Sequence, residues 1–436
     1  MNDPLKIALA GLGTVGVGTL KLLTRHAALL ERRCGRPIVV AAVSARHRDR
    51  DRGVPLQDYA WYDDPVAMAA DADAEVVVEL IGGADGVAKD VSEAAIAAGR
   101  HVVTANKALL AHHGTALARA AEEAGVTLAY EAAVAGGIPI VKALREGLAA
   151  NGVERVFGIL NGTCNYILTN MRESGRQFDD VLAEAQELGY AEADPGFDVD
   201  GVDTAHKLAI LASLAFGCEI NLGAVHTEGI RRVSPLDIRF AEELGFRIKL
   251  LGIAARTGAG VEQRVHPCLV PLEAPIAHIE GVFNAVVAEG DGADTIMLEG
   301  RGAGAGPTAS AVGADLVDIA RRRATPTFAV PAADLEALPA APMERHRGAY
   351  YIRFMVLDRP GVFADVAAAL RDHDVSMEGV LQRGRAPGAV VPVVMTTHDA
   401  EEAGMMRALA QIEALDAVAE PPCMIRIETF STGGAG

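Results

Sequence analysis

The first part of the chain alternates short apolar runs with longer segments rich in alanine. The apolar runs are typical of strands, and they cover Lys6–Ala10, Ile38–Val43, Glu75–Ile81, His101–Thr104 and Val126–Tyr130. The alanine-rich stretches Val91–Ala98 and Thr115–Ala124 favour helices, and each is followed by a glycine that suits a helix end. Strands that alternate with helices indicate βαβ units, so this part predicts a Rossmann-type parallel sheet.

Longer helical segments follow from about Gly136. Phe178–Leu188 and about Asp203–Phe216 have helical character. The glycine-rich stretch Gly300–Gly306 precedes a helical run from Pro307 to Arg322, and proline is favoured near a helix start. Mixed strands and helices of this kind predict an α+β domain.

The last part begins after a proline-rich stretch that we interpret as a linker. From Tyr350 the segments follow the order β-α-β-β-α-β, which is the ferredoxin-like plan. These segments are Tyr350–Leu357, Gly361–Arg371, Val375–Leu381, Ala389–Thr396, Ala400–Leu415 and Met424–Glu428. The predicted division is a nucleotide-binding domain over 1–135, a substrate and dimerisation domain over 136–323 whose residues 301–323 can pack back on the first, a linker over 324–349, and a third domain over 350–430.

The composition argues against nucleic acid and a membrane as binding partners. The formal net charge of −18 opposes binding to nucleic acid, and no apolar stretch approaches the roughly 20 residues that cross a bilayer. The start of the chain lacks a secretory leader pattern, so we expect a cytoplasmic protein with a small-molecule partner. The cysteines form no CxxC pair and are expected to be free thiols; they are Cys34, Cys164, Cys218, Cys268 and Cys423.

A glycine-rich loop directly follows the first predicted strand. It reads Gly11-Leu12-Gly13-Thr14-Val15-Gly16 and opens a helical run. This motif is weak by itself, but its position between strand and helix favours a dinucleotide site, with Thr14 and Val15 at the helix N-terminus beside the pyrophosphate. A purely structural turn is the alternative.

The end of the second strand bears on the choice of nicotinamide cofactor. An acid there would hold the ribose hydroxyl of NAD, whereas arginine suits the phosphate of NADP. Arg46 and Arg48 stand at this turn and no acid does, so NADP is expected, with NAD as the alternative. These arginines could instead belong to a solvated loop.

Two lysines lie where a reaction centre could form. Lys107 follows a strand of the parallel sheet, at the edge where such sheets bind ligands, although it could simply open the next helix. Lys207 is four residues after Asp203, so the two share one helix face and can pair. His206 is a candidate acid or base but equally a structural residue.

An acidic loop precedes Lys207. Glu192, Asp194 and Asp198 could surround a substrate ammonium group. The spacing lacks the pattern of an EF-hand calcium loop, so a calcium site is not favoured.

Three segments resemble the homoserine dehydrogenase family. They are Asn161–Leu168, Gly189–Pro195 and Asp203–Lys207, and the resemblance extends over essentially the whole chain. It implies an oxidoreductase that interconverts aspartate semialdehyde and homoserine in threonine, methionine and isoleucine biosynthesis, as a homodimer or homotetramer. Since the first strand begins near Lys6, we expect a monofunctional enzyme without a fused kinase.

The resemblance also implies roles for single residues. Lys207 would donate the proton to the carbonyl oxygen, with Lys107 beside it near the nicotinamide and Asp203 positioning the reactive end. Glu192 and Asp198 would bind the amino group. The family further implies substrate contacts from Gly162 and Thr163, cofactor contacts from Thr104 and Gly304, and a sodium or potassium ion held near Glu131, Val134, Gly136 and Ile138.

The third domain resembles an ACT regulatory domain. The turn Asp358-Arg359-Pro360-Gly361 follows a strand and opens a helix, and such domains bind an amino acid near this turn. Asp358 and Gly361 are therefore candidates for binding an amino-acid effector, and the pathway of the resembled family implies threonine; a role in assembly alone is the alternative.

Two other functions remain open from the sequence. A Rossmann-type domain hosts many chemistries, so another NADP-linked reductase of a small amino aldehyde or keto acid is one rival. A catalytically silent amino-acid sensor is the other, and the intact lysine and acidic loop argue against it.

Overall fold

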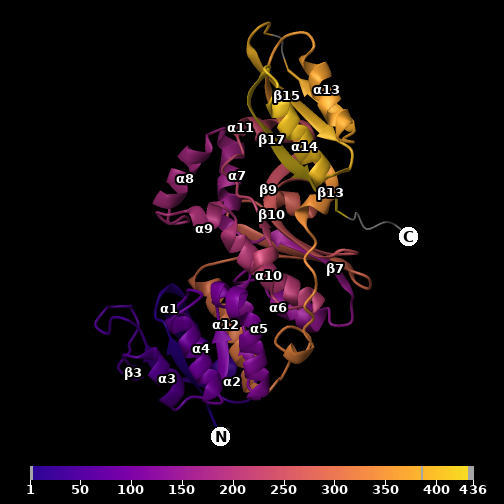
Figure 1. Ribbon diagram of the computed structural model, residues 1–436. Coiled ribbons are helices and arrows are strands. Elements are labelled where there is room, and N and C mark those ends of the chain that lie inside the picture. Colours follow the sequence, from indigo (N-terminus) through magenta and orange to yellow (C-terminus); the bar gives the residue numbers. More distant parts are fainter. Residues whose placement is uncertain (1–2, 384–385, 431–436) are drawn as a thin grey trace.

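The computed structural model describes residues 3–383 and 386–430. The molecule is elongated, with the N-terminal domain at one end, the C-terminal domain at the other, and α10 between them (Figure 1). Among the described residues, no helix is long and apolar enough to cross a membrane.

A six-stranded parallel sheet forms the N-terminal domain. Its order is β3-β2-β1-β4-β5-β6. The strands are β1 (Leu5–Ala10), β2 (Ile38–Ser44), β3 (Ala60–Tyr62), β4 (Val76–Glu79), β5 (His101–Thr104) and β6 (Leu128–Ala129). The helices are α1 (Thr14–Arg25), α2 (Ala27–Cys34), α3 (Pro65–Asp71), α4 (Val87–Ala97) and α5 (Lys107–Glu123). The predicted Rossmann-type parallel sheet is confirmed.

Helix α5 begins at Lys107, eight residues before the alanine-rich stretch Thr115–Ala124, as the alternative interpretation of Lys107 expected. The side chain of Asn106 caps this helix by accepting a hydrogen bond from Leu109 N at 3.0 Å. Strand β3 was not predicted, because its three residues are too few to carry an alternating pattern.

Helix α12 (Ala305–Ala320) completes the N-terminal domain from far along the chain. It packs on α1 so closely that a Cβ on Gly18 would lie 2.7 Å from the carbonyl oxygen of Ala305. Val312 and Leu316 of α12 share one hydrophobic core with Leu9 and Leu20. The helix that follows the glycine-rich loop is thereby held against α12.

The rest of the chain builds one mixed sheet of eleven strands, in the order β12-β11-β7-β9-β10-β17-β13-β15-β14. Its strands are β7 (Val153–Ile159), β9 (Phe246–Thr257), β10 (Gly260–Pro271), β11 (Phe283–Gly290), β12 (Asp294–Arg301), β13 (Arg347–Leu357), β14 (Met377–Gln382), β15 (Val390–Thr397) and β17 (Val418–Ile427), with short β8 (His226–Thr227) on β10 and β16 (Ala400–Glu401) on β13. Strand β17 pairs in parallel with β10, so the sheet runs unbroken from the central region into the C-terminal domain.

Helices cover the faces of this sheet. They are α6 (Ile140–Lys142), α7 (Gly162–Ser174), α8 (Phe178–Glu187), α9 (Gly196–Val199), α10 (Val202–Phe216), α11 (Pro235–Glu243), α13 (Val362–Asp372) and α14 (Glu402–Glu413). A π-helical turn, η2 (Ala143–Gly147), follows α6, and the short 3-10 turns are η1 (Glu131–Ala133), η3 (Leu222–Ala224), η4 (Pro275–His278), η5 (Ala332–Asp334) and η6 (Met343–Arg345). The C-terminal elements follow the predicted β-α-β-β-α-β order, with β16 added.

The segment 324–349 lies against the body of the protein. Phe328 is fully buried, and the carbonyl oxygen of Thr327 accepts a hydrogen bond from the hydroxyl of Tyr130 at 2.8 Å. Further along, Val261 N donates to the carbonyl oxygen of Pro339. The segment has little regular structure but makes specific contacts with the N-terminal domain and with strand β10.

Candidate active site

The glycine-rich loop lies at the carboxyl edge of the parallel sheet. Gly11 has a φ of +103°, and a Cβ there would overlap the backbone of Leu80. A Cβ on Gly16 would overlap the carbonyl oxygen of Gly11, so this position also requires glycine. The space beside Gly13 is open, and Thr14 and Val15 open α1. The loop therefore has the close backbone approach that a pyrophosphate needs.

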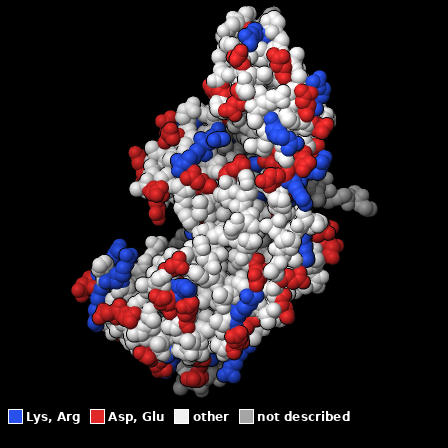
Figure 2. Space-filling model, viewed as in Figure 1, with Lys and Arg blue, Asp and Glu red and all other residues white. Residues whose placement is uncertain are grey.

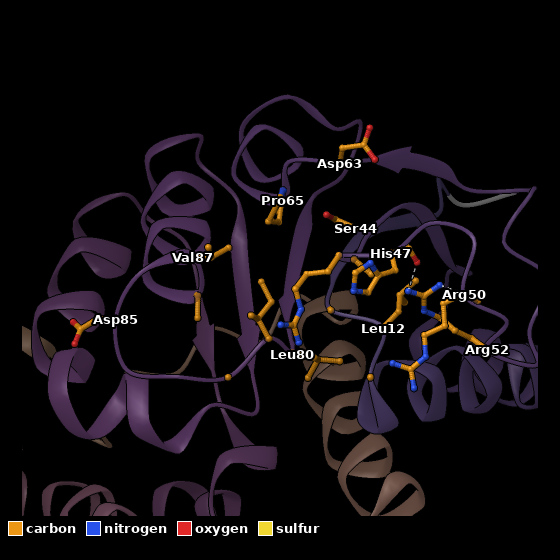
Figure 3. A pocket seen from close by; sticks show the side chains of 17 residues that line it. Leu12, Ser44, His47, Arg50, Arg52, Asp63, Pro65, Leu80, Asp85 and Val87 are labelled. Carbon is orange, nitrogen blue, oxygen red and sulfur yellow. Dashed lines mark hydrogen bonds between the residues drawn. The ribbon is translucent and has the colours of Figure 1, made fainter.

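A cavity of about 600 Å³ lies beside this loop. Arg50, Arg52 and His47 stand on one side of it, and Leu80 and Val87 face them (Figure 3). Its lining comprises Gly11, Leu12, Gly13, Ser44, Ala45, Arg46, His47, Arg50, Arg52, Asp63, Pro65, Leu80, Ile81, Gly82, Asp85, Val87 and Ala88. A volume of this size at the carboxyl edge of a doubly wound sheet suits a nucleotide.

Basic side chains line the part of the cavity next to β2. Arg46 lines the cavity, whereas the guanidinium of Arg48 lies 5.8 Å from the ring centre of Trp61 and does not line it. Arg52 donates hydrogen bonds to the carbonyl oxygens of Arg50 at 2.8 Å and His47 at 2.5 Å, which folds the loop back on itself. Blue side chains gather over this loop, at the left of the view in Figure 2.

Sequence reasoning missed Arg50 and Arg52 as lining residues. The density of arginines after β2 was visible, but the inward fold of the loop depends on hydrogen bonds that no pattern encodes.

Thr104 ends β5 and is fully buried. Its hydroxyl donates to the carboxylate of Glu79 at 2.6 Å, and the same carboxylate accepts from Ile81 N at 2.7 Å. Burial raises the pKa of Glu79, and these hydrogen bonds oppose that shift. The Thr104 hydroxyl is thus bonded to Glu79 within the buried edge of the sheet. Gly304, the other predicted cofactor contact, is the N-cap of α12 and has a φ of +114°.

Lys107, Asp203 and Lys207 form one cluster where α5 of the N-terminal domain packs against α10. Lys207 Nζ donates to Asp203 Oδ2 at 2.7 Å and to the carbonyl oxygen of Leu160 at 2.7 Å. Lys107 Nζ lies 2.9 Å from the other oxygen, Asp203 Oδ1. Lys107 is also the first residue of α5, which is the place that the structural interpretation gave it.

The electrostatics of the cluster follow from burial and pairing. Burial alone would raise the pKa of Asp203, but attraction by Lys207 and Lys107 outweighs it and holds that pKa far below its usual range. Burial lowers the pKa of Lys207, the repulsion of Lys107 adds to this, and Asp203 opposes it. For Lys107, burial is outweighed by Asp203, and its pKa is raised. The two lysines are therefore electrostatically inequivalent, and Lys207 is the easier to deprotonate.

Asn161 joins the cluster to the acidic loop. It lies between β7 and α7, and its Nδ2 donates to Asp198 Oδ1 at 2.8 Å and to Asp203 Oδ2 at 2.9 Å. Burial raises the pKa of Asp198, and the hydrogen bond from Asn161 opposes this. Asn161 belongs to the motif Asn161–Leu168, but the sequence did not predict it as a site residue. An asparagine before a helix is nevertheless a visible capping signal.

The remaining predicted substrate residues surround this group. Gly162 and Thr163 form the first turn of α7, and the Thr163 hydroxyl donates to the carbonyl oxygen of Tyr190 at 2.8 Å. Glu192 is exposed in the loop after α8, near enough for its charge to raise the pKa of Lys107. Asp194 accepts from Gly196 N and so helps to shape the loop.

His206 is packed among rings rather than paired with an acid. Its ring lies edge-on to those of His112 and Phe197, each at 5.4 Å between centres. Burial lowers its pKa, so it is neutral at pH 7. This environment favours the structural role over that of a general acid.

The predicted cation segment is buried and irregular. Ala135 and Gly136 have φ values of +54° and +45°, between the buried residues Val134 and Ile138. The carboxylate of Glu131 accepts from Val141 N at 3.0 Å and Lys142 N at 2.9 Å, and burial raises its pKa to about 7. Because the Glu131 carboxylate accepts hydrogen bonds from these backbone amides, a cation at this segment would be bound by backbone carbonyl oxygens.

The C-terminal domain has a small cavity of about 70 Å³ at the predicted effector turn. Asp358, Arg359 and Phe363 line part of it, and Asp358 accepts a hydrogen bond from Ala386 N at 2.7 Å. Gly361 caps α13 in the left-handed region with a φ of +94°, and it does not line the cavity.

One buried group near β17 has metal-ligand chemistry. His266, Cys268 and Glu428 bring donor atoms within 4.8 Å of one another. Arg264, however, donates to both His266 and Glu428, and its positive charge disfavours a cation there. We interpret the group as part of a buried ion-pair network.

Comparison with known proteins identifies the family. Residues 139–317 match the model "Homoserine dehydrogenase", residues 11–131 match "Homoserine dehydrogenase, NAD binding domain", and residues 350–417 match "ACT domain". A homoserine dehydrogenase of Neisseria gonorrhoeae is 46% identical over 98% of this chain and 99% of its own length.

Solved structures agree with the sequence relatives. A homoserine dehydrogenase from Thiobacillus denitrificans is 46% identical, with a TM-score of 0.91 over 98% of each chain. A hyperthermophilic archaeal homoserine dehydrogenase, solved in complex with NADPH, is 25% identical, with a TM-score of 0.64 over 74% of this chain and all of that one. The chain therefore belongs to the homoserine dehydrogenase family, as an oxidoreductase with an NAD-binding domain, a catalytic domain and a C-terminal ACT domain.

Proposed function

We propose that the protein interconverts L-aspartate 4-semialdehyde and L-homoserine with NADP as its cofactor, acting on a CH–OH group. The single observation that carries the proposal is the cluster of Lys107, Asp203 and Lys207. Asn161 links this cluster to Asp198 of the acidic loop, which suits an amino-acid substrate.

Lys207 is the proposed acid and base of the reaction. The nicotinamide supplies or accepts the hydride when the cofactor is bound. Lys207 delivers a proton to the carbonyl oxygen during reduction and removes it from the hydroxyl during oxidation. Its lowered pKa brings the two protonation states closer in energy, which lets one group serve both directions.

Lys107 and Asp203 set the conditions for that transfer. Asp203 holds Lys207 and Lys107 on its two oxygens and so fixes the distance between them. Lys107 adds positive charge where the carbonyl oxygen becomes negative.

Substrate recognition is assigned to the acidic loop and α7. Glu192 and Asp198 would pair with the substrate ammonium group. Gly162 and Thr163 lie in the first turn of α7, where unpaired backbone amides favour the substrate carboxylate.

NADP is proposed over NAD because of the basic loop. Arg46, Arg50 and Arg52 line the cavity, and arginine suits a ribose phosphate. Gly11, Gly13, Gly16, Thr104 and Gly304 complete the proposed cofactor surroundings. The relative with NADPH bound supports the same choice.

A sodium or potassium ion is proposed at the end of the first domain. The buried, irregular backbone around Gly136 fits an ion held by carbonyl groups of Glu131, Val134, Gly136 and Ile138. Such an ion would brace the junction between the nucleotide and catalytic domains.

The wider role is proposed from the family and the ACT domain. Threonine would bind at Asp358 and Gly361 and inhibit the enzyme as feedback in threonine, methionine and isoleucine biosynthesis. We further propose a cytoplasmic homodimer or homotetramer.

The test is a spectrophotometric assay of homoserine oxidation with NADP and NAD, using Lys207→Ala as the comparison. Homoserine should turn over, faster with NADP, and the variant should lose about 100-fold or more of kcat while still binding cofactor. Preference for another amino alcohol would support the rival reductase, and absence of turnover would support the silent sensor.

A further inference from the structure

Asn161 occupies the point where the acidic loop and the lysine cluster meet. It is buried, and its amide nitrogen donates one hydrogen bond to Asp198 Oδ1 at 2.8 Å and another to Asp203 Oδ2 at 2.9 Å. Its amide oxygen accepts from Cys164 N at 2.8 Å and caps α7. All three of these contacts are made by one planar group.

Two carboxylates this close repel one another, and each raises the cost of ionising the other. Asp203 has two lysines to hold its charge, whereas burial raises the pKa of Asp198 and the hydrogen bond from Asn161 is the largest influence against it. A neutral amide stabilises both negative charges without cancelling either. A lysine or arginine in this place would compete for Asp203 with Lys207.

We propose that Asn161 is a positioning residue that fixes the separation and ionisation of Asp198 and Asp203, and thereby couples recognition of the substrate ammonium to the lysine that transfers the proton. This inference rests on the proposed roles of Asp198 and Asp203. Asn161 itself acts through those two carboxylates.

The rigidity of the arrangement comes from the surrounding backbone. The carbonyl oxygen of Leu160, the residue before Asn161, accepts from Lys207 Nζ at 2.7 Å. A Cβ on Gly162, the residue after it, would lie 2.8 Å from the carbonyl oxygen of Val282. The backbone on both sides of Asn161 is thus held in place by a hydrogen bond and by close packing.

The experiment compares Asn161→Ser with Asn161→Asp. Serine is a good helix cap but cannot reach two carboxylates, so it separates the capping role from the positioning role. Aspartate keeps the shape and the capping oxygen but replaces the donor by a third negative charge.

Asn161→Ser should lower kcat/KM for homoserine by about 10- to 100-fold, as expected for lost hydrogen bonds to charged groups. The acid limb of its kcat/KM profile should move to higher pH, because Asp198 loses the donor that favours its ionised form. The dissociation constant for NADP should stay at the wild-type value. Asn161→Asp should lose more activity than Asn161→Ser.

Asn170→Ser is the matched control, since Asn170 lies on the same helix and its amide donates to Tyr166 O within that helix. Wild-type turnover of homoserine tests the proposed function separately from these variants. An unchanged kcat/KM and an unchanged acid limb in Asn161→Ser would overturn the inference. It would also be overturned if the variant lost NADP affinity and thermal stability together with activity, because that result would indicate a general structural role. If the serine variant does not fold, wild-type activity in Asn161→Asp would overturn it.

Discussion

Replacing Asp203 by asparagine is the most informative change that the site allows. Asparagine has nearly the same shape but removes the charge that both lysines share. At 2.7 Å and an effective dielectric constant of about 20, the Lys207–Asp203 attraction amounts to roughly 6 kcal/mol before desolvation is subtracted. Breaking a buried pair by removing one partner costs about 3–5 kcal/mol, so we expect the free energy of unfolding of Asp203→Asn to fall by that order at pH 7.

The loss should depend on pH in a defined direction. Without Asp203, the pKa of Lys207 falls further below its unfolded value, because burial and Lys107 then act unopposed. The folded variant therefore sheds the Lys207 proton before the unfolded chain does, and its stability deficit should shrink as the pH rises toward the ordinary lysine pKa. Denaturant unfolding at several pH values measures this.

Activity should respond in both reaction directions. In the proposed mechanism reduction needs protonated Lys207, so the alkaline limb of the reduction rate should move to lower pH in Asp203→Asn. Oxidation would need neutral Lys207, so the acid limb of the oxidation rate should also move to lower pH. Asp200→Asn is the control, because Asp200 lies in the same segment and pairs with exposed Arg231. If both limbs keep their wild-type positions in Asp203→Asn, Lys207 is not the titrating group.

Three further predictions concern the cofactor, the ion and the effector. Arg46→Ala should raise KM for NADP by about tenfold or more and leave KM for NAD unchanged, since one charged hydrogen bond is removed; equal changes would contradict the phosphate role. Exchange of sodium and potassium for choline should lower turnover reversibly, and identical rates in all three salts would exclude the ion. Asp358→Ala should abolish inhibition by threonine in a dose-response assay, and an unaltered curve would place the effector elsewhere.

The parallel sheet could be predicted from sequence because its buried strands are short apolar runs between helices of ordinary length. Strand β3 could not, since Ala60–Tyr62 is too short to show a period. The start of α5 at Lys107 was predicted only as an alternative, for another reason. Lys107 and the two histidines that follow in the same helix carry little apolar periodicity, and the cap from Asn106 decides where the helix begins.

The candidate site was predictable only where its contacts are local. Asp203 and Lys207 are four residues apart, so helix geometry alone brings them together. The contact of Lys107 with Asp203 joins residues about a hundred positions apart, and only the packing of α5 against α10 creates it. The hydrogen bonds from Asn161 to Asp198 and Asp203 likewise join residues far apart in the sequence, so only the fold brings them together.

The ACT domain looked separable in sequence, yet the structure ties it firmly to the catalytic domain. Strand β17 pairs with β10, and the buried guanidinium of Arg264 on β10 is held by the carboxylate of Glu428 just after β17. Removing the chain from residue 350 onward would expose the β10 edge and leave Arg264 without that carboxylate, at a cost of several kcal/mol. A truncated enzyme that lost activity would therefore report on folding, not on regulation. A single substitution at Asp358, which lies at the far end of β13 from this junction, changes the proposed effector turn and leaves the sheet intact.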